Sequence, residues 1–492
     1  MVSNFHTKYK LLAKTNRDGG YGRIYHVKCL TDDKTYIAKV ERISLLMELD
    51  ILSRFDHKHI LHLVDFFIQD NIPELAINKP SIILILPLAK TDLYNYNLMT
   101  LSLANRISIM HEIASAIFFL TQHRVLHLDI KPGNILLFDD NSIKLADFGL
   151  IAYQTGNCYC QKNNPVFSFT HRPPEEFINI KFYSDINTIS VIKARPKNSL
   201  RYLSDRTQSW ALGLLFYELL TGKYTYSSLA HKKGNEKDFI RVLMTEIFVK
   251  RDIFLSRIED SDARELIDNM LKFNRNERLH IKDIFLQPFF KKYNISYPIL
   301  GQIIEAIPSI VNDNKINTIL VEILAINMLL GTRNELLFLS VDICYRCWYA
   351  LNVNKIHLYL AGLKIAYHIL NDQLSFKISS LYPLYGINKK SMFLMIKKMV
   401  LYLKGFLYQD NYYNTVTSNY QLAQFMPYLQ DPITYIQTLN TIRGKSLVSD
   451  KQNNPSKDGS SLDLIKLMSN DDYIKVFNRK VYIYNLLNKK LM

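Results

Sequence analysis

The sequence contains little cysteine, with five residues in 492 and no dense pattern among them. This excludes a small secreted domain held together by disulfides, and it indicates a reducing compartment. Two close pairs, Cys158/Cys160 and Cys344/Cys347, have spacings that could suit zinc. The first pair falls in a predicted loop and the second at i, i+3 on a predicted apolar helix, so buried free thiols are the favoured interpretation.

Long apolar runs are also missing. The opening MVSNFHTKYK has no apolar core, so it does not predict a secretory signal. Residues 316–331 are strongly apolar, but Glu322 and Asn327 interrupt them before they reach the length of a membrane span. We therefore expect a soluble, intracellular protein, in the cytoplasm or the nucleus, with no membrane partner.

Acidic residues are fewer than basic ones, 45 against 61, which gives a net charge of +16. The excess is spread along the chain, so a solvated, lysine-rich surface is the default and a nucleic-acid partner is not expected. Hydrophobic residues make up 48% and aromatic residues 12%, which excludes wholesale disorder. A length of 492 residues predicts two or three domains.

The most informative stretch, residues 127–149, reads HLDIKPGNILLFDDNSIKLADFG. Transfer of a phosphoryl group to a hydroxyl needs positioning and charge neutralisation more than covalent chemistry. Asp129 can accept the hydroxyl proton, and Lys131 can neutralise charge on the migrating group. Asn134 and Asp147 offer the oxygen ligands that suit Mg²⁺. The stretch therefore predicts a phosphoryl-transfer site.

The pattern H-x-D-x-K-x-x-N followed by D-F-G closely resembles the catalytic and metal loops of eukaryotic-type protein kinases. The lysine two residues after the aspartate is the form seen in Ser/Thr kinases. The resemblance covers about residues 9–292 and implies a bilobal α+β kinase fold, with ATP and Mg²⁺ as cofactors and a protein as substrate. We expect a kinase domain over 1–293, with a small lobe over about 9–88 and a large lobe over about 89–293.

Upstream, residues 9–28 alternate around a glycine cluster, as two strands joined by a tight turn would. The kinase glycine loop is G-x-G-x-x-G-x-V. This sequence has Arg17 in place of the first glycine, followed by Gly19, Gly22 and Ile24. The resemblance implies that these glycines let backbone amides approach the phosphates of ATP.

The strand YIAK resembles the kinase V-A-I-K strand, which implies that Lys39 binds the α- and β-phosphates and that Ala38 lies beneath the adenine. The acid that orients Lys39 is predicted to be Glu48, on a helix over 43–55, with Glu41 as the alternative. Glu48 comes only nine residues after Lys39, so the first turns of the family's helix look missing.

The apolar run SIILIL at residues 81–86 predicts a buried strand that ends at Pro87. By the same resemblance Leu86 is the gatekeeper, and adenine binds the backbone of Pro87 and Ala89. Asp92 matches a ribose-binding position, although it could equally cap a helix, and both roles can hold together.

The run SFTHRPPE, which ends at Glu175, resembles the end of a kinase activation segment. The arginine before P-P-E is found in the group of cyclin-dependent and other proline-directed kinases. Glu175 is expected to pair with Arg278. Gln208 replaces the aspartate that normally binds the backbone of the catalytic loop. The region 176–207 has about twenty residues more than the family usually has, and no role is assigned to it.

Kinases that are switched on by a phosphate in the activation segment gather arginines around it. In the cyclin-dependent group these arginines occupy three positions, which here hold Met47, Leu128 and Ala152. The sequence therefore predicts activity without phosphorylation of the activation segment.

Beyond residue 293, apolar residues at i, i+3 and i+4 predict helices over 316–331, 333–349, 355–370 and 389–408. Their order and spacing resemble a cyclin box, so we expect an all-α, cyclin-like domain over 294–445. The resemblance implies an intramolecular partner that presses on the helix 43–55, through side chains such as Leu46 or Phe55.

Within this region Arg346 matches the cyclin pattern, whereas Tyr345 and Asn371 depart from it, so an unrelated helical domain is the alternative. A polar linker over 446–461 and an amphipathic C-terminal helix over 462–492 complete the chain.

The whole arrangement resembles a Ser/Thr protein kinase fused to a cyclin-like domain, as in large DNA viruses, which would place the protein in a virus or its host cell. Two alternatives stay open. The chain could be a pseudokinase scaffold, to which Arg17, Gln208 and the short helix before Glu48 point. Its C-terminal half could instead be a module that targets the kinase to its substrate.

Overall fold

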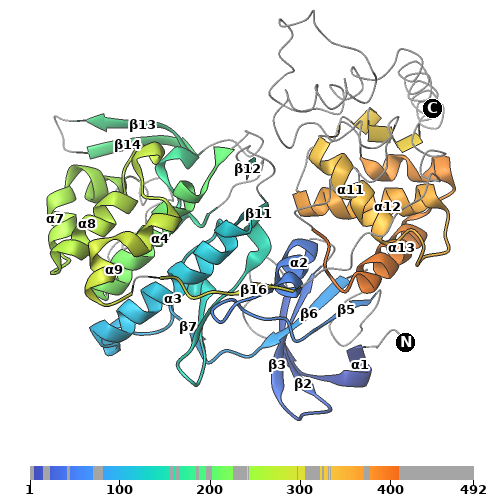
Figure 1. Cartoon of the computed structure of the whole chain (residues 1–492), viewed down its shortest axis with the longest axis horizontal. Helices are drawn as coiled ribbons and strands as arrows, with labels where there is room; N and C mark the ends of the chain where they lie inside the picture. Colours follow the sequence, from blue (N-terminus) through green and yellow to red (C-terminus); the bar gives the residue numbers. More distant parts are fainter. Residues whose placement is uncertain are drawn as a thin grey trace, which may run out of the picture.

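The computed structural model describes residues 5–14, 23–41, 45–69, 81–153, 160–161, 167–183, 188–194, 202–224, 241, 243–295, 297–304, 322–323, 326–327, 329–330, 332, 334–370 and 377–408. The predicted phosphate contacts of Gly19 and Gly22, the linker 446–461 and the C-terminal helix 462–492 lie outside these residues. The described part consists of a small lobe built on a sheet, a larger helical lobe and a further group of helices (Figure 1).

The small lobe is an antiparallel sheet with the strand order β1-β2-β3-β6-β5. Its strands are β1 (Tyr9–Lys14), β2 (Arg23–Cys29), β3 (Thr35–Glu41), β5 (Asp65–Gln69) and β6 (Ser81–Pro87), and the short helix α1 (Phe5–Lys8) precedes them. The two strands predicted on either side of the glycine cluster are confirmed as β1 and β2.

Strand β6 is apolar throughout because both faces of the sheet are covered. Ile83 and Ile85 belong to an outer cluster, whereas Ile82, Leu84 and Leu86 belong to the main core shared with the rest of the chain. The members of the outer cluster are Phe5, Tyr9, Tyr25, Val27, Cys29, Ala38, Val40, Phe67, Ile83 and Ile85. Successive side chains of a strand point to opposite faces, so a strand buried on both sides shows no polar alternation.

Helix α2 (Leu46–Arg54) packs in the main core, and every one of its residues is buried. It lies within the helix predicted over 43–55 and leads directly into the short strand β4 (Phe55–Asp56). Figure 1 shows α2 between the sheet of the small lobe and the C-terminal helices. Burial of charged residues such as Glu48 and Asp50 on this helix means that each needs a partner.

The large lobe is built around α3 (Leu103–Gln122), the long amphipathic helix that the apolar periodicity of residues 103–122 predicts. Ser102 caps this helix by accepting a hydrogen bond from Asn105 N at 3.2 Å. By length and composition α3 alone among the described helices could cross a membrane, yet it is a largely buried core helix that packs against α4 (Asp205–Thr221). The other α-helices of the lobe are α7 (Arg251–Ser256), α8 (Ser261–Met270) and α9 (Pro288–Lys292).

Short antiparallel pairs frame the loop 127–134 and the residues that follow it. β8 (Val125–Leu126) pairs with β11 (Ala152–Tyr153), while β9 (Ile135–Leu137) pairs with both β10 (Ile143–Leu145) and β7 (Thr91–Asp92). The other short helices among the described residues are the π-helix Thr245–Val249 and the 3₁₀ helices Leu98–Thr100, Pro132–Asn134, Phe148–Leu150, Phe169–His171, Pro174–Glu176, Arg275–Glu277, Ile281–Leu286, Ile378–Ser380 and Tyr382–Tyr385.

The extra residues of the region 176–207 contain a β-hairpin. Its strands are β13 (Phe177–Tyr183) and β14 (Thr188–Ala194), which extend from the large lobe at the left of Figure 1. A second short pair, β12 (Cys160–Gln161) and β15 (Tyr202–Leu203), joins the activation segment to the residues before α4.

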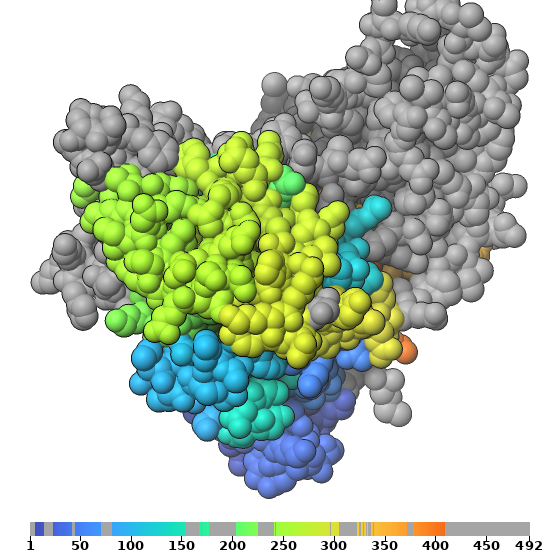
Figure 2. Space-filling view, turned by 60° about the vertical axis from the view of Figure 1, so that its left-hand side comes forward, coloured from blue at the N-terminus to red at the C-terminus, as the bar shows by residue number. Residues whose placement is uncertain are grey.

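After the large lobe, the segment 297–304 runs back along the kinase-like part. Ile299 N donates to Ser115 Oγ on α3 at 3.0 Å, and β16 (Gln302–Ile303) pairs with β4 beside the end of α2. In Figure 2 the yellow part of the chain, to which this segment belongs, lies against the blue small lobe. The segment therefore contacts both lobes before the chain enters its helical region.

The helical region contains α11 (Asn334–Arg346), α12 (Lys355–Leu370) and α13 (Lys389–Tyr402). The first two confirm the helices predicted over 333–349 and 355–370. Helices α11 and α12 pack closely at Gly362, which has no Cβ. A Cβ placed there would lie only 2.9 Å from the backbone oxygen of Ser340. The buried thiols of Cys344 and Cys347 are free, and burial raises the pKa of Cys347 to about 12.

The prediction that the last of these helices continues to residue 408 is wrong. Helix α13 ends at Tyr402, and Gly405 has a positive φ of 81° with its N–H bonded to Val400 O. A glycine in the left-handed conformation is a common helix terminator, since it has no Cβ to clash. The residues after α13 form a separate segment, 403–408, which we call the docking segment.

Candidate active site

Lys39 on β3 lies against two carboxylates from different elements. Its Nζ is 2.6 Å from Glu48 Oε2 on α2 and 3.0 Å from Asp147 Oδ1. Burial acts to lower the pKa of Lys39, but the two carboxylates outweigh it and hold that pKa above its ordinary value. Burial raises the pKa of Glu48, and the Lys39 ammonium opposes the shift. The structure thus pairs Lys39 with Glu48 in spite of their short separation in the sequence.

Asp129 is almost completely buried between the loop 127–134, to which it belongs, and the activation segment. Lys131 Nζ is 2.7 Å from its Oδ2, and Ser168 donates to its Oδ1 through both the hydroxyl, at 2.8 Å, and the backbone N–H, at 3.0 Å. Burial would raise the pKa of Asp129, but Lys131 and the Ser168 hydrogen bonds hold it below its ordinary value. The carboxylate is therefore ionised at neutral pH.

Ser168 was not among the predicted site residues, yet its hydroxyl also accepts from Lys131 Nζ at 2.8 Å. Its location in the activation segment, a few residues before Glu175, was the available signal in the sequence.

Asn134 and Asp147 have donor atoms that fit a magnesium ion. Asn134 Nδ2 donates to Asp129 O at 2.7 Å and to Asp129 Oδ2 at 3.0 Å. These two hydrogen bonds fix the orientation of the Asn134 side-chain amide in the site. Asp147 contacts Lys39 through Oδ1. Its backbone has a φ of 63°, an uncommon value for a residue with a Cβ and one that is often found at functional sites. The amide oxygen of Asn134 and the second oxygen of Asp147 are the hard ligands that Mg²⁺ prefers.

Gln208 on α4 binds the backbone of the loop 127–134 through its side chain. Its Oε1 accepts from His127 N at 3.1 Å, and its Nε2 donates to Thr121 Oγ1 at 2.8 Å. Gln208, though longer and neutral, thus still accepts a hydrogen bond from the backbone of the loop 127–134. Burial lowers the pKa of His127, whose neutral ring lies 5.2 Å from the Phe148 ring. The loop is thus fixed on both sides by buried groups.

The nucleotide side of the site requires one correction. Ala38 does not lie beneath an adenine, because its side chain is fully buried in the outer cluster, on the face of β3 opposite to Lys39. Ile37 alternates with it and packs against the main core, on the face of Lys39. Ile24 is the direct antiparallel partner of Lys39 and so shares its face. Alternation along the strand could have identified Ile37 from the sequence.

The two remaining nucleotide candidates follow β6. Ala89 is partly buried in the connection between the lobes. Asp92 is buried and accepts hydrogen bonds from Asn95 N at 2.9 Å and from Asn95 Nδ2 at 2.7 Å. Asp92 therefore stabilises a turn and does not cap a helix, and its predicted contact with ribose stays a prediction.

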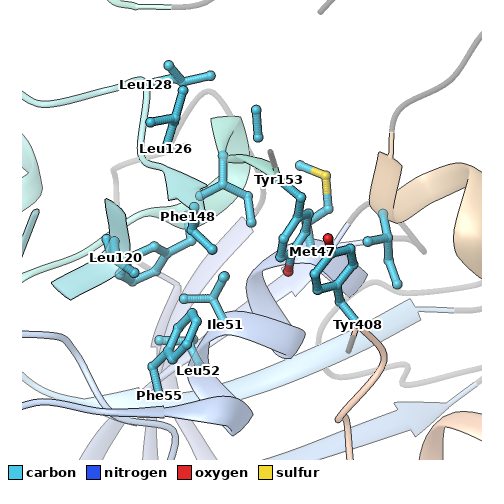
Figure 3. Packing of buried hydrophobic residues seen from close by; sticks show 14 of the residues in the cluster. Met47, Ile51, Leu52, Phe55, Leu120, Leu126, Leu128, Phe148, Tyr153 and Tyr408 are labelled. Carbon is cyan, nitrogen blue, oxygen red and sulfur yellow. The ribbon is translucent and has the colours of Figure 1, made fainter. Parts of the chain in front are cut away.

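The three positions that hold phosphate-binding arginines in cyclin-dependent kinases are apolar and buried. Met47, Leu128 and Ala152 are exposed by 6%, 0% and 5% respectively, within the main core. Figure 3 shows Met47 and Leu128 on either side of Tyr153, among aliphatic and aromatic side chains. An apolar contact thus replaces a cationic pocket at the three positions.

The activation segment is anchored at its end by the predicted ion pair. Arg278 donates to Glu175 through two nitrogens, at 2.8 Å and 2.7 Å, and its guanidinium lies 5.1 Å from the ring centre of Trp210. The bidentate geometry is the strong form of this interaction and confirms the pairing.

Comparison with known proteins identifies the fold. The protein kinase domain family matches residues 14–290, which is more than half of the chain. The chain belongs to this family.

Among curated proteins, the chain is 29% identical over 266 residues to NUAK family SNF1-like kinase 1 of Mus musculus, a match that covers 54% of the chain and 34% of that protein. It is 24% identical over 307 residues to an Aurora kinase of Schizosaccharomyces pombe, with coverages of 60% and 74%. It is 25% identical over 299 residues to serine/threonine-protein kinase PLK4 of Aedes aegypti, with coverages of 58% and 33%. The matched part therefore spans only about a third of the NUAK and PLK4 relatives.

Proposed function

We propose that this chain is a serine/threonine protein kinase that transfers the γ-phosphate of ATP to a protein hydroxyl. The observation that carries the proposal is the joint placement of two groups: the pair Lys39–Glu48 beside Asp147, and Asp129 beside Lys131. A phosphoryl-transfer enzyme needs cations for the phosphate charge and an ionised base for the acceptor.

In this reaction the acceptor oxygen forms a bond to the γ-phosphorus as the bond to the bridging β–γ oxygen breaks, so that ADP leaves. Asp129 receives the acceptor's proton, because it is ionised and within reach of a hydroxyl. Lys131 and Lys39 balance the charge of the phosphates. A magnesium ion held by Asn134 and Asp147 would supply further neutralisation of the phosphate oxygens.

The local geometry favours an aliphatic alcohol as the acceptor. The chain's own Ser168 hydroxyl lies 2.8 Å from both Asp129 Oδ1 and Lys131 Nζ, so a small hydroxyl fits between the base and the cation. The Ser/Thr kinase relatives support the same choice.

We also propose that the helical region over 294–445, cyclin-like by its sequence pattern, regulates the kinase in cis. The support is direct contact with α2: helix α12 lies beside it, and a Cβ placed on Gly405 would be 2.5 Å from Ser53 Oγ and 3.1 Å from Leu49. Of the two residues expected to make this contact, Phe55 pairs through β4 with Ile303 of this region, while its ring packs on Phe119 of α3. A contact through Leu46 stays a prediction. A module that only recruits substrate would not need to approach this helix so closely.

A pseudokinase scaffold is the alternative, and it is less consistent with the described site. The ionised base, the lysine, its paired glutamate and both candidate metal ligands are all retained and connected. The substituted residue Gln208 still holds the loop 127–134.

The proposal is tested by incubating the full chain with labelled ATP, Mg²⁺ and a degenerate peptide library, followed by analysis of the phosphorylated amino acids. The library should include peptides with proline after the acceptor, because the residues before P-P-E resemble those of proline-directed kinases. We expect label on Ser or Thr, and none with Asp147→Asn, which removes a metal-ligating charge. Equal labelling by the variant, or no labelling by the natural chain, contradicts the proposal.

A further inference from the structure

The contact between α2 and the helical region converges on one carboxylate, Asp50, which is fully buried. Its Oδ1 accepts hydrogen bonds from Leu407 N at 2.7 Å and from Tyr408 N at 2.8 Å. Its Oδ2 accepts from the Tyr153 hydroxyl and lies 3.4 Å from Arg54 Nη2, one helical turn further along. Asp50 therefore connects α2, the activation segment and the docking segment.

The aromatic rings around Asp50 strengthen this connection. The rings of Tyr153 and Tyr408 stack with centroids 4.1 Å apart and planes 19° apart. Figure 3 shows the two side chains next to each other. The Arg54 guanidinium lies 5.4 Å and 5.2 Å from these two ring centres. A buried carboxylate is stable only when donors and a counter-charge surround it, and this cluster supplies both.

The docking segment is fixed from its other side by α11. Arg346 donates to Phe406 O at 2.7 Å and to Leu407 O at 2.6 Å, and it pairs with Asp342 at 2.8 Å. The carbonyl groups of Phe406 and Leu407 are thus bound by α11, while the N–H groups of Leu407 and Tyr408 are bound by α2. Any movement of Asp50 has to break one of these two sets of buried hydrogen bonds.

Asp50 and Glu48 lie on opposite sides of α2, because a separation of two residues corresponds to about 200° around a helix. Glu48 faces Lys39 on the inside, and Asp50 faces the docking segment on the outside. We propose that Asp50 is a positioning residue: it ties α2 to the docking segment and to Tyr153, and thereby keeps Glu48 within reach of Lys39. This inference rests on the proposed kinase activity and names the residue through which the helical region acts on it.

The first test is a double-mutant cycle in the full chain, measured as kcat and KM on a peptide from the library. Asp50→Ala should lower kcat at least about tenfold, with the KM for peptide changed by less than about twofold. Asp50→Asn should recover part of this loss, since its amide oxygen still accepts from the docking segment. If Asp50 acts through Glu48, the double variant with Glu48→Gln should be no more than about twofold slower than Glu48→Gln alone.

A matched control separates positioning from loss of stability. Asp260→Ala removes the N-cap of α8, where Asp260 accepts from Ala263 N at 2.9 Å, far along the chain from α2. This variant should lose some thermal stability while its kcat stays within about twofold of the natural chain. An equal effect of Asp50→Ala and Asp260→Ala on kcat overturns the inference, as does a double variant in which the Asp50 and Glu48 effects multiply.

A second measurement does not depend on turnover. Amide hydrogen exchange of residues 46–54 and 403–408 should become at least about tenfold faster in Asp50→Ala, less so in Asp50→Asn, and stay unchanged in Asp260→Ala. Unchanged exchange in Asp50→Ala overturns the inference even if the kinase is active. If the natural chain transfers no phosphate, the kinase proposal fails, and with it the positioning role of Asp50 in catalysis, whereas faster exchange would still establish the tether.

Discussion

At Asp129, two neighbours decide whether the carboxylate can act as a base. Burial alone would favour its protonated form, whereas Lys131 and Ser168 stabilise the ionised form. The same contacts place a hydroxyl beside the carboxylate. The residue is therefore prepared for proton transfer before any substrate arrives.

Asp129→Asn should lower kcat by roughly 10²–10⁴-fold, because the amide cannot accept the proton of the substrate hydroxyl. Affinity for ATP should change by less than about twofold, since Asp129 contacts the acceptor side of the site. Steady-state kinetics and titration with a fluorescent ATP analogue measure the two quantities. A variant with natural kcat, or with a large loss of ATP affinity, would refute this role.

The pH dependence of the reaction follows from Lys131. Since the pKa of Asp129 is held below its ordinary value, kcat/KM should not fall through protonation of Asp129 between about pH 8 and pH 5. Lys131→Met removes the main influence that lowers this pKa, so the acidic limb of the variant's residual activity should move to higher pH. The comparison requires only pH profiles of the two proteins. Superimposable acidic limbs would show that Lys131 does not set the pKa of the base.

At the scale of single residues, the sequence predicts which side chains form the site better than it predicts the direction in which each side chain points. Lys39, Glu48, Asp129, Lys131 and Asp147 follow from motifs, and the structure brings each into contact with at least one other of them. The role predicted for Ala38 is wrong because the motif assigns it by residue type alone. Side chains along a strand alternate between its two faces, and Ala38 lies on the face opposite to Lys39.

Among the elements, α2 is the one whose support differs most from the family pattern. Where the family uses arginines and a phosphate, Met47, Leu128 and Ala152 pack with Tyr153 in the main core (Figure 3). A charged group introduced there would be buried without a partner, at a substantial free-energy cost.

Removal of phosphate should therefore leave the enzyme active. Treatment of the active full chain with a broad-specificity phosphatase should change kcat by less than about twofold, because none of the three apolar positions can bind a phosphate. Mass spectrometry of residues 150–172 would establish that the activation segment carries none. Activity that disappears with a phosphate in this range would contradict the expectation.

The helices also show which structural features the sequence does and does not predict. The bounds of α3 and α12 follow from apolar periodicity, which is strong in both. The end of α13 at Tyr402 was missed because apolar residues continue beyond it, although Gly405 marks the change. The docking segment binds largely through backbone groups, and such contacts leave no side-chain pattern in a sequence.

On the scale of the whole molecule, the chain folds back twice onto the kinase domain. The segment 297–304 contacts α3 and β4. About a hundred residues later, the docking segment contacts α2. The middle and the C-terminal end of α2 are thus tied to residues that follow the kinase domain. The cyclin-box resemblance predicts that the helical region meets the helix 43–55, but no motif indicates that residues 297–304 or 403–408 make the contacts, because each contact depends on how distant parts of the chain pack.

The measurement that tests the central claim most directly compares the full chain with a chain ending at Ile304, which keeps the segment on α3 and β4 but removes the docking segment. Without the docking segment on α2, the shortened chain should still bind ATP but turn over at least tenfold more slowly, which corresponds to a change in barrier of about 1.4 kcal/mol or more. Adding residues 305–492 as a separate chain should restore part of the rate only at high concentration, since the natural linkage supplies an effective concentration on the order of millimolar. If the shortened chain binds ATP and phosphorylates the peptide as fast as the full chain, the helical region does not support α2 and the account of regulation in cis is wrong.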